Sequence, residues 1–198
     1  GIDRAELESS VYDVLLSDVA VADAVQPTSI EGLAVLPSDR SLAGAEVELV
    51  PSSGRERRLR HVLDGAGEHY DFVLLDCPPS LGLLTVNALV AATHVLIPIQ
   101  ASYFALEGTD DLLETIDKIK ARPNTELQML GVLVTMFDRR TILAREVREE
   151  IIGVFGDLVF DTFITKSVRL EESPAHRSCI YEHAPSSSGA YEYYRLCE

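Results

Sequence analysis

Polar residues follow several apolar runs of this sequence, and the first such place combines an acid with two prolines. In the stretch YDFVLLDCPPS, four apolar residues lead into Asp76, which Cys77, Pro78 and Pro79 follow. A carboxylate at the end of a buried strand can hold Mg²⁺ or its water beside a phosphate. The two prolines remove two backbone donors and stiffen the loop, so it can respond to a terminal phosphate without refolding as helix. The alternative is that Asp76 simply caps the next helix or turn.

A second apolar run, in VLIPIQASYFALEG, also ends in polar residues. We expect Pro98 to end the strand ladder and to leave Gln100, Ser102 and Tyr103 near the same edge. The stretch is equally an ordinary strand-to-helix connection, in which Glu107 near the helix start interacts favourably with the helix dipole.

A third run, in GVLVTMFDRRT, ends at Thr135, Met136 and Asp138. Polar groups at this strand end can meet the edge of a nucleotide base. Asp138 can equally be an N-cap, and the two arginines after it can be solvated surface charges.

The stretch FITKSVRLEESPAHR brings Lys166, Arg169 and Arg177 close to His176 in the sequence. A loop of this kind can face the phosphates of a nucleotide or of DNA. The alternative is a partly solvated surface turn, and the two glutamates in the same stretch oppose a simple basic patch.

Other catalytic or metal-binding patterns do not stand out. The histidines fit no metal-ligand spacing, and Cys77 stands beside an acid without the basic partner that makes a reactive thiolate. The cysteines, at 77, 179 and 197, form no CxxC pair and no even-numbered framework, which is typical of a reducing compartment. With no leader and no apolar run long enough to span a bilayer, we expect a cytoplasmic protein.

The charge of the chain is acidic and unevenly distributed. The 198 residues carry a net charge of −15, which disfavours wrapping nucleic acid with the whole surface. Residues 1–138 have a net charge of −13 and residues 139–198 a net charge of −2. We therefore expect any anion-binding face in the last third of the chain.

Short apolar runs alternate with segments of helical period. The runs are rich in Val, Ile and Leu and mostly lack polar alternation, which is typical of strands covered on both faces of a parallel sheet. The expected strands are residues 33–36, 72–75, 95–99, 131–135 and 158–164. The expected helices are residues 5–16, 41–50, 55–63, 83–91, 107–120, 141–155 and 190–196.

This alternation predicts a doubly wound α/β fold, with a mostly parallel sheet and helices on both faces. We expect residues 1–198 to form a single domain. No strand precedes the first expected helix, in which Leu7, Val11, Val14 and Leu15 should point inward. The start of the sequence therefore looks like the middle of a domain.

Taken in order, the stretches resemble the ParA/Soj family of chromosome- and plasmid-partitioning ATPases, in the deviant Walker group that also contains MinD. The resemblance covers nearly the whole chain. It is carried by GIDRAELESSVYDVLL, LPSDRSLAGAEVELV, GRERRLRHVL, YDFVLLDCPPSLGLLTVNAL, VLIPIQASYFALEG, GVLVTMFDRRT, VRLEESPAH and SSSGAYEYYRL.

The resemblance implies a P-loop NTPase-like fold with ATP and Mg²⁺ as cofactors. FVLLDCPP is similar to the family's Walker B strand and switch II, so Asp76 would be the catalytic acid that positions the hydration shell of Mg²⁺, and the two prolines would sense the γ-phosphate. The residues it places at the nucleotide are Cys77, Pro78, Pro79, Pro98, Thr135, Met136, Asp138, Thr165 and Lys166. The charge asymmetry and the family's habit of binding DNA through its C-terminal part point to Lys166, Arg169 and Arg195 as phosphate contacts.

Three departures from the family pattern change these expectations. The sequence holds no GxxxxGK[ST] phosphate loop and no first strand, so we expect an N-terminally incomplete domain with little or no ATPase activity by itself. Thr165-Lys166-Ser167 stands where the family has proline, arginine and asparagine, and Arg177 replaces a glycine. Lysine and arginine are not equivalent phosphate ligands, which weakens the expected contacts at 166.

The function that the resemblance implies is DNA partitioning by an ATP-switched dimer. The ATP-bound homodimer would bind DNA without sequence preference near the nucleoid, and a ParB-type partner would stimulate hydrolysis. One alternative is a non-catalytic, truncated paralogue that acts as an interaction module. Another is a MinD-like membrane-site ATPase, which the short, non-basic end YEYYRLCE disfavours.

Overall fold

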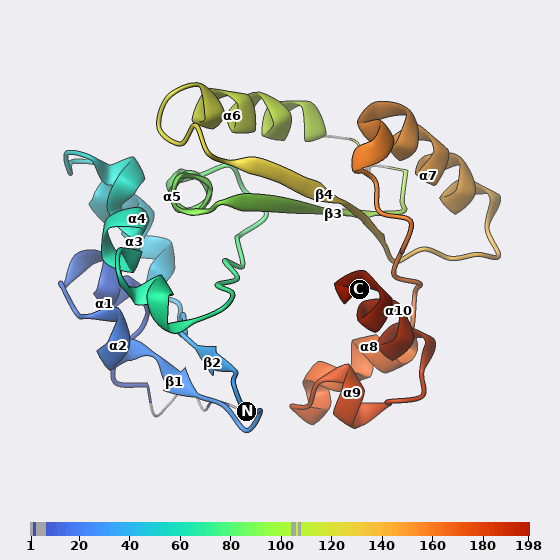
Figure 1. Cartoon of the computed structure of the whole chain (residues 1–198), viewed down its shortest axis with the longest axis horizontal. Helices are drawn as coiled ribbons and strands as arrows, with labels where there is room; N and C mark the ends of the chain where they lie inside the picture. Colours follow the sequence, from blue (N-terminus) through green and yellow to red (C-terminus); the bar gives the residue numbers. More distant parts are fainter. Residues whose placement is uncertain (1, 3–6, 104–105, 107) are drawn as a thin grey trace. The chain divides into compact units, whose positions relative to one another are not determined.

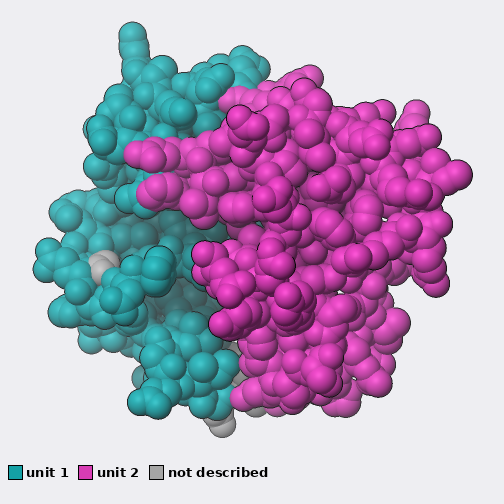
Figure 2. Space-filling model, turned by 45° about the vertical axis from the view of Figure 1, so that its right-hand side comes forward, with its two compact units in different colours: residues 1–93, 114–127 teal, residues 94–113, 128–198 magenta. Residues whose placement is uncertain are grey.

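The computed structural model describes residue 2, residues 7–103, residue 106 and residues 108–198 (Figure 1). The chain divides into two compact units, coloured separately in Figure 2. Unit 1 comprises residues 1–93 and 114–127, and unit 2 comprises residues 94–113 and 128–198. Each unit has its own fully buried side chains, for example Leu49 and Val90 in unit 1 and Val132 and Ile151 in unit 2.

Unit 1 is mainly helical. Its helices are α1 (Val11–Leu16), α2 (Val21–Ala24), α3 (Leu42–Leu49), α4 (Arg58–Leu63) and α5 (Leu83–Ala91), with 3-10 turns η2 (Arg55–Arg57) and η3 (Ala66–His69). Two short strands, β1 (Gln26–Pro27) and β2 (Ala34–Val35), pair antiparallel. Helix α1 packs against α3 and α4, and α4 packs against α5.

The first helix begins later than the apolar pattern predicts. Ser10 caps α1: its hydroxyl accepts from the Tyr12 amide at 3.2 Å, and the Asp13 carboxylate accepts from the Ser10 amide at 2.8 Å. This reciprocal capping box sets the start of the helix at residue 11. Val14 and Leu15 are buried as expected, and the part of the expected helix at residue 5 lies outside the described residues.

Two buried asparagines hold the helices of unit 1 together. The Asn87 side chain accepts from the Leu59 amide at 3.0 Å and donates to the carbonyls of Arg55 and Leu83 at 2.8 and 2.9 Å. The Asn124 amide group donates to the carbonyls of Leu89 and Ala92 at 2.9 and 2.7 Å. These bonds fix both ends of α5, the helix that follows the Asp76 segment.

Unit 2 is built on a parallel strand pair. Strands β3 (His94–Gln100) and β4 (Gln128–Thr135) lie side by side (Figure 1). Ile97 lies opposite Val132, and Gln100 lies opposite Thr135. The helices are α7 (Ile142–Phe155), α8 (Val168–Glu172), α9 (Ile180–His183) and α10 (Ser188–Cys197), with 3-10 turns η4 (Gly156–Leu158) and η5 (Ser173–His176). Helix α6 (Thr109–Ala121) begins in unit 2 and ends in unit 1. Glu107, the first residue of the expected helix, lies outside the described residues.

Two of the predicted strands do not form. Residues 72–75 form no strand: Phe72 is 88% exposed and Leu74 is 92% exposed. A strand exists only through hydrogen bonds to a neighbour, and no described residue pairs with this segment. The segment at 158–164 makes only isolated bridges, Val132 with Val159 and Phe137 with Thr165.

Strand β3 also differs from its expected form. Ile97 and Ile99 are buried while Leu96, Pro98 and Gln100 are exposed, so only one face of this strand is covered. Pro98 does not end the ladder, because β3 continues to Gln100 and Pro98 itself lies opposite Leu133. A proline is tolerated inside a strand where its missing N–H would not face the partner.

Candidate functional site

Asp76 lies in unit 1, in an extended segment with no regular structure. The residue is exposed, and its carboxylate makes no hydrogen bond or ion pair with any described residue. The capping alternative fails, because α5 begins after Gly82 and its first turn is bonded by another acid: the Leu84 amide donates to Glu46 Oε1 at 3.2 Å. The structure therefore leaves the Asp76 carboxylate available to a ligand.

The start of α5 depends on a close approach between Gly82 and Glu46. A Cβ atom at position 82 would overlap the Glu46 carboxylate, whose Oε1 caps the helix. The φ of Gly82, −77°, is ordinary, so a side chain here would matter only by displacing the Glu46 carboxylate from the Leu84 amide.

The residues after Asp76 are exposed as well. Pro78 and Pro79 lie in a segment without helix or strand, and the stiffness of this loop stays a prediction. Although Cys77 is exposed as a residue, partial burial of its thiol raises the pKa of that thiol, and the negative charge of Asp76 raises it further. Cys77 is accordingly unsuited to act as a nucleophile, as the sequence predicts.

Unit 2 brings four of the predicted nucleotide residues to one edge. The Ala101 amide donates to the Thr135 carbonyl at 2.9 Å where β3 and β4 end. Met136 then has a φ of 53°, an unusual conformation for a residue with a side chain. Beyond it, the Phe137 amide donates to Ile164 at 3.0 Å and the Lys166 amide donates to Phe137 at 3.1 Å. Thr135, Met136, Thr165 and Lys166 therefore share this edge, and Pro98 lies two residues before it on β3.

Asp138 is engaged by a neighbouring arginine. The Arg140 guanidinium forms two parallel bonds to the Asp138 carboxylate, at 3.0 and 2.9 Å, and the Arg140 amide adds a third at 3.0 Å. These bonds, with a smaller contribution from Lys166, lower the pKa of Asp138 to about 2. Asp138 is not an N-cap, because the hydroxyl of Thr141 caps α7. Nor is Arg140 a free surface charge.

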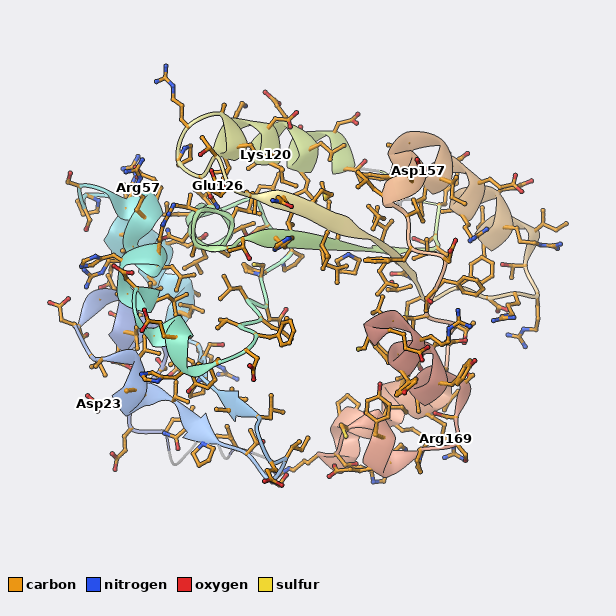
Figure 3. All side chains as sticks on the ribbon, viewed as in Figure 1. Asp23, Arg57, Lys120, Glu126, Asp157 and Arg169 are labelled. Carbon is orange, nitrogen blue, oxygen red and sulfur yellow. The ribbon has the colours of Figure 1, made fainter. Side chains whose placement is uncertain are left out.

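The predicted DNA contacts differ in their surroundings. Lys166 is exposed, and it forms no ion pair within the described ranges. Arg169, labelled in Figure 3, lies on α8 and pairs with Glu172 at 3.0 Å. Arg195 on α10 pairs with Glu198 at 3.8 Å. Two of the three cations are thus partly neutralised by acids three residues further along the chain.

A second basic cluster lies in unit 1 and was not predicted. It consists of Arg55, Arg57, Arg58 and Arg60, at the start of α4. The Arg58 guanidinium donates to the Leu15 carbonyl at 2.6 Å and pairs with Asp18. Arg57, labelled in Figure 3, and Arg60 are exposed. The stretch RERRLR indicates this cluster in the sequence. The net charge of −13 over residues 1–138 does not reveal it, because the many acids of that range outweigh the four arginines.

The described residues contain no cluster of three or more His, Cys, Asp or Glu side chains that could hold a metal by themselves. A Mg²⁺ ion bound through water needs fewer protein ligands, because the phosphates and waters supply most of its oxygens. A free, exposed carboxylate such as Asp76 fits that role. Within the part of the chain that the structure describes, none of the helices has the length and apolar character needed to cross a membrane.

The predicted site residues therefore form two groups. Asp76, Cys77, Pro78 and Pro79 belong to unit 1. The other residues, all in unit 2, are Pro98, Thr135, Met136, Asp138, Thr165, Lys166, Arg169 and Arg195.

The chain is similar to known proteins both in sequence and in structure. An AAA domain model matches residues 1–129. The sporulation initiation inhibitor protein Soj of Bacillus subtilis (strain 168) is 46% identical over 198 residues, which cover 100% of this chain and 78% of the relative. The chromosome partitioning protein ParA of Myxococcus xanthus (strain DK1622) is 43% identical over 196 residues, covering 99% of this chain and 69% of the relative.

Among solved structures, a cobyrinic acid a,c-diamide synthase from Mycobacterium smegmatis with bound ADP and magnesium is 38% identical, with a TM-score of 0.78. The match covers 84% of this chain and 68% of that chain. The α/β fold with a parallel strand pair and packed helices is thus the P-loop NTPase-like fold predicted from the sequence. The chain belongs to the ParA/Soj family of partitioning ATPases.

Proposed function

We propose that the chain is the larger part of an ATP-switched DNA-partitioning ATPase, in which Asp76 holds the water shell of Mg²⁺. The observation that carries this proposal is the free, exposed carboxylate of Asp76 at the end of a family motif. Because the Asp76 carboxylate has neither a hydrogen bond nor an ion pair among the described residues, it is available to the water shell of a metal ion.

Several residues of unit 2 are proposed to contact the base. Thr135, Met136, Thr165 and Lys166 share one edge of the strand pair, where backbone groups and short side chains can meet a base edge. The positive φ of Met136 supports this role, because strained backbone is concentrated at functional sites. Asp138 contributes indirectly, by holding Arg140.

The ATP and Mg²⁺ chemistry follows from the family. Mg²⁺, when bound, neutralises charge that develops on the phosphates during attack by water. The 198 residues include no GxxxxGK[ST] motif, and we propose that a phosphate-loop segment outside them supplies the phosphate cradle. The proposed homodimer, its non-specific binding of nucleoid DNA in a cytoplasmic setting and its ParB-type partner rest on the resemblance to the Soj and ParA relatives.

The test is a chimera of this chain with the family's phosphate-loop segment at its N-terminus. Asp76→Asn should lower Mg²⁺-dependent ATP turnover by a factor on the order of 100, with an unchanged melting temperature. The matched control is Asp71→Asn, which removes another exposed carboxylate from the same segment. Unchanged turnover in the Asp76 variant contradicts the assignment. A parent chimera that folds but does not hydrolyse ATP favours the non-catalytic interaction module instead.

A further inference from the structure

Glu192 is a buried acid in the middle of α10. The residue is 8% exposed, and its carboxylate accepts from the Thr165 amide at 2.8 Å and from the Thr165 hydroxyl at 2.9 Å. The Arg139 guanidinium lies 3.8 Å from the same carboxylate. Burying a carboxylate is unfavourable unless donors surround it, so these contacts are what permit Glu192 to be there.

Thr165 is held from two sides. On one side it bridges to Phe137, just beyond the end of β4, where the amides of Phe137 and Lys166 donate across the pair at 3.0 and 3.1 Å. On the other side, Glu192 takes both donors of Thr165, its amide and its hydroxyl. The backbone of Thr165 is therefore fixed by the strand end and by α10 together.

Docking of α10 does not itself require a buried acid. Ala190 on the same helix is 2% exposed, and Gly189 lies so close to Leu170 that any Cβ at 189 would overlap the leucine side chain. Apolar packing thus already holds α10 against the rest of unit 2. The carboxylate adds a directional contact between α10 and residues 165–167. Among the described residues of α10, only Glu192 hydrogen-bonds to residues 165–167.

We propose that Glu192 is a positioning residue, which sets the backbone of residues 165–167 through Thr165 and so determines how selectively this chain binds adenine over other bases. The inference rests on the proposed function, which assigns Thr165 and Lys166 to the base. The ligand concerned is the base of a purine nucleoside triphosphate. Glu192 acts through Thr165 and does not touch the nucleotide.

Arg139 balances the charge of this arrangement. Its guanidinium lies over the Phe163 ring at 5.0 Å and reaches Glu192 at 3.8 Å. Phe163 in turn contacts Phe137, with ring centroids 4.7 Å apart. The cation is therefore held in place by aromatic packing next to the carboxylate that it neutralises.

The first measurement is amide hydrogen exchange on the 198-residue chain. In Glu192→Gln, which keeps the size of the side chain but removes its charge, exchange at Thr165 and Lys166 should accelerate about tenfold, as expected when the charge-assisted bonds to Thr165 become weaker neutral ones. The matched control is Glu198→Gln, an exposed acid on the same helix region, which should change neither amide. Unchanged protection at both amides in Glu192→Gln overturns the positioning role.

The second measurement is base discrimination by the chimera with the phosphate-loop segment. In Glu192→Gln the ratio of ATP to GTP affinity should fall about tenfold, while the affinity for inorganic tripolyphosphate stays constant. Thr165→Val, which removes only the hydroxyl, should lower the ratio less. The double variant should show less than the sum of the two effects, because both changes break the same contact.

The outcomes separate this inference from the proposed function. A parent chimera without measurable ATP affinity overturns the proposed function, and base selectivity through Glu192 with it. A parent that binds ATP, combined with an unchanged ATP-to-GTP ratio in Glu192→Gln, overturns the inference alone. A loss of tripolyphosphate affinity equal to the loss of ATP affinity shows a general structural role and also overturns it.

Discussion

At the scale of single residues, the candidate site contrasts a free acid with two engaged acids. Asp76 has no partner among the described residues, Asp138 is bound by Arg140, and Glu192 is bound by Thr165. A carboxylate that already accepts hydrogen bonds within the chain holds its neighbours in place, whereas an unbonded carboxylate is available to bind a ligand. This difference is why we propose the metal-holding role for Asp76 and structural roles for Asp138 and Glu192.

The Asp138–Arg140 pair should make the stability of the fold depend on pH. The pKa of Asp138 is lowered from 3.8 to about 2, mainly by its hydrogen bonds to Arg140. A lowered folded-state pKa means that the pair stabilises the fold above about pH 4 and that this contribution is lost as the pH falls towards 2. Arg140→Gln should raise the pKa of Asp138 towards its ordinary value, which carboxyl-carbon NMR titration measures.

The control for that titration is Lys166→Gln. Lys166 contributes only a smaller Coulombic effect, so this variant should shift the pKa of Asp138 less than Arg140→Gln does. Equal pKa values for Asp138 in the parent and in Arg140→Gln would show that the bidentate bond is not formed in solution.

At the scale of elements, the start of α5 is set by a contact between two helices. The Glu46 carboxylate on α3 caps α5, in a position that a Cβ atom at residue 82 would overlap. This contact joins parts of the chain that are 38 residues apart. No local pattern around residue 82 indicates it.

Gly82→Ala should therefore destabilise unit 1. The added Cβ displaces the Glu46 carboxylate and removes the bond to the Leu84 amide, a loss of about 1 kcal/mol in the free energy of unfolding, typical of a lost cap. Urea denaturation measures it. In a Glu46→Ala background the same change should cost much less, because the overlap is gone. An equal cost in both backgrounds contradicts the explanation.

At the scale of the whole molecule, the distribution of unpaired cations limits where an anionic partner can bind. The chain has a net charge of −15, so an individual cation acts against a repulsive field. In unit 2, Arg169 and Arg195 are paired with acids, whereas in unit 1 Arg57 and Arg60 form no ion pair with described residues. Two surfaces therefore compete for the phosphate contacts of the proposed DNA binding.

The DNA prediction compares these two surfaces directly. In the ATP-bound chimera, Lys166→Glu with Arg169→Glu should weaken binding to two unrelated duplexes equally and reduce its salt dependence, since phosphate contacts release counterions. Arg57→Glu with Arg60→Glu changes the charge by the same amount in unit 1. Titration of both duplexes at several salt concentrations measures it. If only the second pair weakens binding, the contacts lie on the α4 cluster and the assignment to Lys166 and Arg169 is wrong.

A further prediction concerns the 198 residues by themselves. Because they contain no phosphate-loop motif, we expect Mg-ATP affinity weaker than micromolar and negligible turnover. Isothermal titration calorimetry checks this. Binding on the order of micromolar or tighter would mean that other residues supply the phosphate cradle.

Much of the helical structure was determined by the sequence alone. Helix α5 begins and ends at the predicted residues, and α7 begins one residue later than predicted, with Ala144, Val147, Ile151 and Phe155 buried at helical spacing. Helices are predictable in this way because their hydrogen bonds are local and one face repeats every few residues. The family, and with it the expected roles of Asp76 and the two prolines, was also readable from ordered motifs.

The tertiary structure alone decided which predicted strands form and which acids are free. Residues 72–75 have the composition of a buried strand, yet they remain exposed because a strand needs a neighbour's N–H and C=O groups. Likewise, the bonds of Glu192 to Thr165 span 27 residues, and nothing at either position marks the other as its partner. Contacts between distant residues depend on how the chain packs, which no local pattern of residue types encodes.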